Sequence, residues 1–117
     1  NKPASQCARS VAYSNGTTVV AANDGVVHVH GASGSQKLDE SDEWIECMAF
    51  SPDGARFAVG SHDNRIYVYD TSNWSLLGTC KGHSSYIMAL DWSCDGNYLR
   101  TNCGAYELLF WNMPSCD

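Results

Sequence analysis

The sequence predicts an all-β fold, because three of its features favour strands over helices. Aromatic residues make up 11% of the 117 residues, and many Val, Thr and Ile residues accompany them, a composition typical of strands. Short apolar runs are bounded by turn residues, without a sustained helical period. An internal repeat of about 40 residues has the length of one four-stranded β-propeller blade. We therefore expect a β-propeller fragment with about two full four-stranded blades and a third, incomplete blade.

Each copy of the repeat opens with a short apolar run, followed by an aromatic residue, a serine and a turn that ends in glycine. The three glycines, Gly16, Gly54 and Gly96, lie 38 and 42 residues apart. Glycine after Asn or Asp supplies the positive φ that a tight hairpin turn requires. A second shared pattern follows downstream in each copy, at offsets of 39 and 42 residues. Its equivalent positions are Asp24, Asp63 and Ala105.

The apolar runs predict the strands of each blade in order. The innermost strands are expected at 45–50 and 87–92, the second at 57–59 and 98–101, the third at 66–69 and 108–111, and the outer ones at 76–80 and, more weakly, 36–38. The Gly/Ser-rich segment 31–37 is expected to form a turn. About eleven strands are too few for the four to eight blades that close a propeller. We therefore expect an excerpt of one larger propeller, with blades at 1–39, 40–80 and 81–117, the last without its outer strand.

Composition and charge exclude several classes of partner. The formal net charge is −6, opposite to the basic surfaces that bind phosphate backbones or anionic membranes. The sequence has no apolar run of roughly 18 residues and does not open with a secretory signal. We expect no nucleic acid and no membrane among its partners.

Six cysteines occur without a Cys-x-x-Cys pair, so their spacing does not fit a common structural zinc site. Cys7, Cys47 and Cys80 lie in or beside apolar runs, where a free thiol behaves as a small hydrophobic residue. Reduced cysteines in a cytosolic protein are the favoured interpretation. We expect no metal and no cofactor.

Two groups of residues could carry chemistry, a pair of histidines as metal ligands and a His-Ser-Ser run as part of a hydrolase site. Each group also has a purely structural interpretation. His28 and His30 share one face of a strand and could bind a metal, but the equivalent positions in the other copies hold Tyr, Leu or Trp, which favours packing. His83-Ser84-Ser85 with Asp91 suggests a small hydrolase on a β scaffold. Neighbours in sequence are not a catalytic triad, and no G-x-S-x-G motif is present. We expect no enzymatic activity, and we expect Asp91 to face the central channel or to pair with a neighbour.

The third copy carries the most specific motifs. Gly82-His83 precedes its innermost strand and Trp111-Asn112 closes its third strand, dipeptides that resemble those of WD repeats. The run Gly-Ser-His-Asp-Asn at 60–64 and the run Gly-His-Ser-Ser at 82–85 are similar to the echinoderm microtubule-associated protein-like family. The resemblance covers about 45–115, whereas 1–44 resembles only a generic blade. It identifies the chain as part of the C-terminal propeller of that family.

The resemblance implies a tandem pair of propellers that contacts soluble tubulin, and a separate N-terminal region that oligomerises and promotes microtubule binding. It implies a location in the cytoplasm on the microtubule cytoskeleton, and in some relatives in a cilium or flagellum. We therefore expect a non-catalytic protein-interaction scaffold that binds tubulin or microtubules and the remaining blades of its own propeller. An acidic chain is a poor ligand for acidic tubulin tails, so the folded tubulin body is the expected contact. The alternative is a WD-repeat adaptor in ciliary, signalling or RNA-processing complexes.

The same resemblance implies a buried chain of hydrogen bonds in each blade, made by His, a hydroxyl, Trp and Asp. The third blade has His83 and Trp111 but Ala105 in place of Asp. The second blade has Asp63, with Tyr69 in the Trp position and Ser41 in the His position. A buried His without its acceptor costs about 1–3 kcal/mol unless another group substitutes. The residues expected to hold the blades together are Asp63, Tyr69, His83, Trp92 and Trp111.

An acidic run, 39–43, precedes Trp44 and joins the first blade to the second. It should line one rim together with the turns at 62–64, 84–86 and 102–106. An exposed aromatic residue framed by charge is typical of a binding hot spot. The alternative is a solvated loop, which burial of Trp44 would favour. The expected partner-binding residues are Trp44, Glu43, His62, Asn64, Ser85, Tyr86 and Tyr106.

Overall fold

The computed structural model describes residues 8–14, 16–22, 25–31, 34–40, 43–113 and 116, and every regular element within these ranges is a strand. The all-β expectation is therefore confirmed. The strands are β1 (Ala8–Ser14), β2 (Thr17–Ala22), β3 (Val27–Gly31), β4 (Gly34–Leu38), β5 (Ile45–Phe50), β6 (Arg56–Ser61), β7 (Arg65–Asp70), β8 (Ser75–Lys81), β9 (Ile87–Trp92), β10 (Tyr98–Cys103) and β11 (Leu108–Asn112). The part of the chain that is described holds no helix with the length and hydrophobicity needed to traverse a bilayer.

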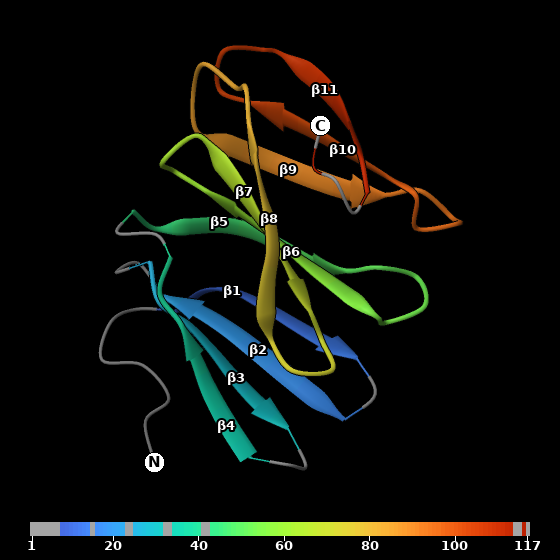
Figure 1. The fold of residues 1–117 in the computed structure, drawn as a ribbon. Coiled ribbons are helices and arrows are strands. Elements are labelled where there is room, and N and C mark those ends of the chain that lie inside the picture. The colour runs from blue at the N-terminus through green and yellow to red at the C-terminus, as the bar shows by residue number, and fades with distance from the viewer. Residues whose placement is uncertain are drawn as a thin grey trace.

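The strands form three antiparallel sheets, in the orders β1-β2-β3-β4, β5-β6-β7-β8 and β11-β10-β9. In each sheet, neighbours in space are neighbours in sequence, as expected for propeller blades. Figure 1 shows the three sheets packed side by side, from β1–β4 at the bottom to β9–β11 at the top. Among the described residues, no strand pairs with the outer edge of β11. The third sheet therefore lacks the fourth strand of the other two, as predicted.

The repeated Ser-x-Asp-Gly pattern has a local cause in the second sheet. The Ser51 hydroxyl donates to the Asp53 carboxylate at 2.6 Å and accepts the Arg56 backbone N–H at 3.1 Å. Gly54 closes the turn with a φ of 74°, a conformation that costs glycine little. The hydrogen bond from Ser51 is the main reason that the pKa of Asp53 lies below its ordinary value. Each residue of the pattern thus fixes the hairpin between β5 and β6.

The turn predicted at residues 31–37 is wrong in its extent, because part of this segment is a strand. Most of segment 31–37 is strand, because Gly34–Leu38 forms β4 and pairs with β3 through His30↔Ser35 and Val27↔Leu38. Only Leu38 of this strand is buried. An outer strand has an open edge and exposed side chains, so backbone pairing defines it without an apolar pattern. Residues 32–33 of the expected turn lie outside the described residues.

Two apolar clusters join the sheets. The first packs Val19 and Val29 of the first sheet against Phe57 and Tyr69 of the second. The second packs Ile66 and Val68 from the opposite face of the second sheet, against a group from the third. That group comprises Ile87, Trp92, Leu99 and Trp111. The second sheet is thereby covered on both faces, and burial of apolar surface between sheets is the main stabilising term.

The outer faces of the first and third sheets are uncovered. Val11 and Tyr13 of β1 are 67% and 70% exposed, and Leu108 and Phe110 of β11 are 57% and 64% exposed. A hollow of about 410 Å³ lies beside Phe110 on the third sheet. Rows of exposed apolar side chains on a sheet face are typical of a surface that another element covers.

Candidate interaction surface

Four connections meet at one end of the sheets, because successive antiparallel strands reverse direction. They are β4–β5, β6–β7, β8–β9 and β10–β11, and they lie at the left of the view in Figure 1. The expected partner-binding residues all fall in these connections. Their role in binding remains a prediction, whereas their positions are described by the structure.

Three of the expected residues contact one another across the boundary between the second and third sheets. The His62 ring stacks on the Tyr86 ring, with centroids 4.4 Å apart and planes at 12°. The His62 ring also meets the Trp44 ring edge to face, with centroids 4.7 Å apart. The His62 Nε2 atom lies 2.9 Å from Glu46 Oε1, and the His62 backbone N–H donates to the Trp44 carbonyl at 3.0 Å. Loops that are 42 residues apart in sequence thus form one row of rings.

The β10–β11 turn lies against Tyr86, at one end of this row. Gly104 donates its N–H to the Tyr86 carbonyl at 3.0 Å, and a Cβ at this glycine would come within 2.7 Å of the Tyr86 ring and 2.9 Å of the Ser85 hydroxyl. In the same turn, Tyr106 has a φ of 65°, so its side chain projects from a backbone conformation that bulky residues rarely adopt. Tyr106 is 97% exposed.

We call the surface formed by Trp44, His62, Tyr86 and Tyr106 the aromatic rim. Trp44 and Tyr86 are 39% and 38% exposed, so the expectation that Trp44 reaches solvent is met. Two further predicted residues flank the rim: Glu43 is exposed beside Trp44, and Asn64 is half-buried in the β6–β7 turn. Sequence reasoning missed Glu46 and Gly104. Glu46 could have been predicted from its position two residues after Trp44, because alternate residues of an extended segment lie on the same face.

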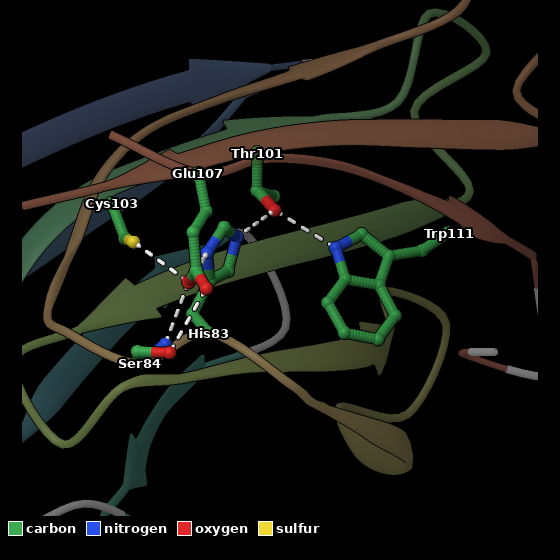
Figure 2. A network of polar contacts seen from close by, with 6 residues as sticks. All are labelled: His83, Ser84, Thr101, Cys103, Glu107 and Trp111. Atoms are coloured by element: carbon green, nitrogen blue, oxygen red, sulfur yellow. Dashed lines mark hydrogen bonds and ion pairs between the residues drawn. The ribbon is translucent and has the colours of Figure 1, made fainter. Parts of the chain in front are cut away.

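A polar network lies in the third sheet (Figure 2). The Trp111 Nε1–H donates to the Thr101 hydroxyl oxygen at 2.8 Å, and the same oxygen is 2.7 Å from His83 Nε2. The other ring nitrogen of His83, Nδ1, lies 3.5 Å from Glu107 Oε1. Thr101, His83 and Trp111 are all buried. When Thr101 donates its O–H to Nε2, the other nitrogen, Nδ1, carries the proton and faces Glu107. This buried Nδ1 lies at ion-pair distance from the carboxylate and has no hydrogen-bond partner.

Glu107 is the carboxylate that faces His83 in the blade that has Ala105 in place of aspartate, at 3.5 Å and without a hydrogen bond to Nδ1. Its carboxylate also accepts the Ser84 backbone N–H at 2.7 Å and the Ser84 hydroxyl at 2.9 Å. These bonds, the backbone one foremost, lower the pKa of Glu107 to about 2. Burial lowers the pKa of His83 below its ordinary value, although Glu107 acts in the opposite direction. The carboxylate nearest to His83 thus comes from two residues further along the chain, and it contributes an electrostatic contact without a hydrogen bond to Nδ1.

The second sheet uses other carboxylates at the same end. The Tyr67 hydroxyl donates to Asp63, and the Tyr69 hydroxyl donates to Glu40. Burial, with Asp63 as a second cause, raises the pKa of Tyr67 to about 12. Burial and Glu40 raise the pKa of Tyr69 as well. Ser41, which occupies the His position of this blade, lies outside the described residues.

Trp92, the remaining residue expected to hold the blades together, links two sheets. Its Nε1–H donates to the Ala49 carbonyl of β5 at 3.1 Å, and its ring belongs to the apolar cluster between the second and third sheets. The expected pairing of Asp91 is confirmed, because Arg100 Nη2 donates to its carboxylate at 2.9 Å. Asp91 and Arg100 lie on the uncovered face of the third sheet.

The network in the third sheet has the order hydroxyl, imidazole, carboxylate that a hydrolase uses. Its hydroxyl belongs to Thr101, which is 1% exposed, and the His83 side chain is 0% exposed, so a substrate has no access to either group. The hydroxyl of Ser84 donates to Glu107 and not to His83. The adjacent serine and histidine therefore lack the contact that a nucleophile and its base require.

Among the described residues, the side chains best placed to hold a metal ion belong to the same network. One donor atom each from His83, Cys103 and Glu107 lies within 4.8 Å of the others. Glu107 already accepts from Ser84 and, at 3.3 Å, from the Cys103 thiol. These hydrogen bonds account for the positions of Cys103 and Glu107, whereas the buried Nδ1 of His83 has no hydrogen-bond partner. Of the two histidines predicted as alternative ligands, His28 and His30, the latter has its Nδ1 3.0 Å from the Ser35 hydroxyl of β4.

Comparisons with known proteins agree with the fold. The family model "Echinoderm microtubule-associated protein second beta-propeller" matches residues 3–117. A ciliary WD repeat-containing protein, ctxp80 of Euplotoides octocarinatus, is 52% identical over 93% of this chain and 16% of its own length. Echinoderm microtubule-associated protein-like 4 of Xenopus laevis is 50% identical over 65% of this chain and 9% of its own length. Echinoderm microtubule-associated protein-like 2 of Homo sapiens is 48% identical over 66% of this chain and 12% of its own length.

A solved structure shares the fold at low sequence identity. A chain in the crystal structure of the mitotic checkpoint complex superposes with a TM-score of 0.83 at 21% identity, over 92% of this chain and 35% of its own. The chain therefore spans a small part of the relatives that it matches. Since the family model covers nearly the whole sequence, the chain belongs to the echinoderm microtubule-associated protein family, within the second β-propeller.

Proposed function

We propose that this chain is part of a non-catalytic protein-interaction propeller, and that the aromatic rim is one of its binding surfaces. The observation that carries the proposal is the contact of Trp44, His62 and Tyr86 across two sheets. Trp and Tyr are enriched in binding hot spots. Loops on a rigid β scaffold are common sites of recognition. The three sheets act as consecutive blades of one larger propeller, whose remaining blades cover the outer faces of the first and third.

The finer proposal is that the partner is tubulin or another microtubule component. Its support is the family membership and the names of the relatives, several of which are microtubule-associated proteins. The proposal includes a location in the cytoplasm, on the microtubule cytoskeleton. The net charge of −6 disfavours contact with acidic tubulin tails, so the proposed contact is with the folded body of tubulin.

Co-sedimentation of the full-length protein with microtubules tests this proposal. We expect the unmodified protein to pellet with microtubules, and the double variant W44A/Y86A to pellet less. Cys94→Ser is the matched control, because Cys94 is exposed in the β9–β10 turn at the opposite end of the sheets. Thermal melting of each variant establishes that it remains folded. A full-length protein that stays in the supernatant would contradict the microtubule proposal, and equal pelleting of all variants would contradict the role of the rim.

A second candidate partner is supported by one specific observation. The ciliary WD repeat-containing protein of Euplotoides octocarinatus is 52% identical over 93% of this chain. This relative favours a scaffold in ciliary complexes. Localisation of the tagged full-length protein in ciliated cells separates the candidates, since enrichment in the cilium without microtubule pelleting would favour the ciliary adaptor. A cytoplasmic array of labelled microtubules would favour the first candidate.

A further inference from the structure

A buried nitrogen atom of the third sheet lacks a partner. The Nδ1 atom of His83 has no hydrogen-bond partner, although the His83 side chain is 0% exposed. A buried polar atom without a partner is destabilising, and a bound water molecule or metal ion is a common reason for one. The donor atoms around Nδ1 decide which of the two fits better.

Two further donor atoms lie next to this nitrogen. Glu107 Oε1 is 3.5 Å from His83 Nδ1 and 3.3 Å from Cys103 Sγ, and one donor atom from each of the three residues lies within 4.8 Å of the others. Figure 2 shows the His83 ring and the Cys103 sulfur beside the Glu107 carboxylate. Tetrahedral zinc holds nitrogen, oxygen and sulfur ligands about 3.3–3.6 Å apart, given bonds of about 2.0–2.3 Å. Two of the three pairs already have such a separation.

Thr101 positions the His83 ring for metal binding. The Thr101 hydroxyl oxygen lies 2.7 Å from His83 Nε2, and its two lone pairs can accept both the Nε2–H and the Trp111 Nε1–H. In this tautomer the proton lies on Nε2, and the lone pair of Nδ1 is available for a metal ion. Histidine ligands usually donate their second N–H to an oxygen atom in this way, which fixes the tautomer and the ring orientation.

The hydrogen bonds of Glu107 leave room for a metal ion. Its Oε1 atom accepts the Ser84 backbone N–H at 2.7 Å and the Cys103 thiol at 3.3 Å, and a carboxylate oxygen has two lone pairs. When the thiol loses its proton, the lone pair that accepted it becomes available, while the bond from Ser84 remains. The Glu107 side chain is 35% exposed, so solvent reaches the site, gives the ion a path and supplies water as a fourth ligand.

The repeat itself does not require these residue types. The three positions that lie 42 residues earlier, in the second copy, offer no imidazole, thiol or carboxylate; they hold Ser41, Ser61 and Arg65. A blade therefore forms without them. The three metal-binding groups of the third copy are an addition to the blade pattern and not a consequence of it.

Nitrogen, sulfur and oxygen donors in one site favour a metal ion of borderline softness, and Zn²⁺ is the common one in proteins. We propose that His83 Nδ1, Cys103 Sγ and Glu107 Oε1 bind a Zn²⁺ ion. A Zn–S bond replaces the S–H bond of Cys103, and the proton is released to solvent. The ion links the β8–β9 connection to the β10–β11 turn, both of which contribute to the aromatic rim. This proposal replaces the expectation of no metal, which rested on the spacing of the cysteines.

The zinc content of the full-length protein tests the proposal. The protein is exposed to Zn²⁺, dialysed, and analysed by mass spectrometry of the metal beside the variant Cys103→Ser, which installs the residue type of Ser61. We expect the unmodified protein to hold one more equivalent of zinc than this variant. The affinity of the variant should be at least about 100-fold weaker, because a lost ligand costs more than a lost outer-shell partner. Cys94→Ser removes an exposed thiol at the opposite end of the sheets and should retain the zinc.

Cobalt distinguishes a metal ion from a water molecule at the same position. Co²⁺ adopts the tetrahedral geometry of zinc, and its bond to a thiolate gives an ultraviolet charge-transfer band. We expect this band in the unmodified protein and in Cys94→Ser, with the contribution of one thiolate missing in Cys103→Ser. Equal zinc content and equal cobalt spectra of the unmodified protein and Cys103→Ser would overturn the proposal and leave water as the partner of Nδ1.

A second variant keeps the test decisive if Cys103→Ser does not fold, which thermal melting of the metal-free proteins establishes. Glu107→Gln retains the thiolate and the imidazole but removes the negative charge of the third ligand. It should keep the cobalt–thiolate band and bind zinc roughly 10–100-fold more weakly. An unchanged affinity would contradict the assignment of Glu107 as a ligand. Neither readout involves a partner protein, so the outcome is independent of the microtubule proposal.

Discussion

The second and third sheets contain the same repeat, but only the second buries both of its faces. Ile66 and Val68 of β7 are 0% exposed, because the third sheet covers them. The residues 42 positions later, Leu108 and Phe110 of β11, are 57% and 64% exposed. The residue type and the position in the strand are similar, whereas the neighbour is present in one case and absent in the other.

This comparison shows that an apolar residue on a blade is buried by the next blade and not by its own sheet. A four-stranded sheet is too thin to bury its side chains alone, so the repeat is stable only when copies are stacked. The exposed faces of the first and third sheets are then the positions at which the further blades of the proposed larger propeller would stack. The chain spans 16% or less of the length of the three relatives compared above.

The two sheets also differ in the polar groups that hold their common end. In the third sheet, Thr101 joins His83 to Trp111. In the second sheet, the positions of Thr101 and Trp111 hold Val59 and Tyr69, and Tyr69 donates to a carboxylate. The same backbone arrangement is therefore compatible with two sets of buried hydrogen bonds, provided that each buried donor finds an acceptor.

The largest expected effect breaks the stacking itself. Ile66→Ala should destabilise the full-length protein by about 2–5 kcal/mol, through lost burial and the cavity that remains. If a further blade covers the third sheet, Leu108→Ala should have an effect of the same order, although Leu108 is exposed in the 117-residue chain. Chemical denaturation of both variants measures this. A silent Leu108→Ala beside a costly Ile66→Ala would show that the third sheet is an end of the propeller.

The next effect concerns the shared hydroxyl of the third sheet. Thr101→Val gives this position a residue resembling Val59 of the second sheet, and leaves the Trp111 N–H and His83 Nε2 without their partner. We expect a loss of about 1–3 kcal/mol, the cost of unsatisfied buried polar groups. Thr101→Ser keeps the hydroxyl and is the matched control, which should remain closer to the unmodified protein in thermal melting. Equal losses for both variants would indicate that the methyl group, and not the hydroxyl, matters.

A smaller effect depends on pH and tests Glu107. Its folded-state pKa of about 2 lies below the ordinary value of 4.5, so the unfolded chain binds more protons between these pH values. Stability from this group is complete above pH 4.5 and is lost as the pH falls towards 2. Glu107→Gln should therefore show a shallower fall in melting temperature over this range than the unmodified protein. Identical slopes would mean that Ser84 and His83 do not stabilise the Glu107 carboxylate.

The smallest expected effect on stability is at the aromatic rim. Tyr106→Ala should change the free energy of unfolding by no more than about 0.5 kcal/mol, because the side chain is almost fully exposed. In the co-sedimentation assay, the same variant should pellet less with microtubules than the unmodified protein. This separation of stability from binding distinguishes the rim from the buried network of the third sheet. A clear loss of stability would indicate that Tyr106 packs against a part of the protein beyond this chain.

The repeat made much of the fold predictable from the sequence. Equivalent apolar runs and Asp-Gly turns located the strands, since strand burial and hairpin geometry impose short-range patterns. The extent of β4 was not predicted, because an exposed outer strand needs no apolar pattern. The grouping of Trp44, His62 and Tyr86 was anticipated from the end of the sheet at which their loops lie.

The polar networks were harder to predict. Glu107 reaches His83 from a turn 24 residues away, and Glu40 reaches Tyr69 across 29 residues. The long side chain of glutamate brings the carboxylate of Glu107 close to His83, although the aspartate was expected at the position of Ala105. The spacing of residues in the sequence does not reveal how far a side chain extends. Similarly, the contact of Gly104 with Tyr86 depends on the close approach of two loops.

Hydroxyl-radical footprinting of the full-length protein, read by mass spectrometry, tests most directly whether stacked copies cover the blade faces. Aromatic side chains in contact with solvent are modified, and Tyr106 in the rim serves as the internal standard for an exposed ring. The account predicts that Phe110 and Tyr98, on the uncovered face of the third sheet, are protected in the full-length protein while Tyr106 is modified. Modification of Phe110 to the same extent as Tyr106 would contradict it.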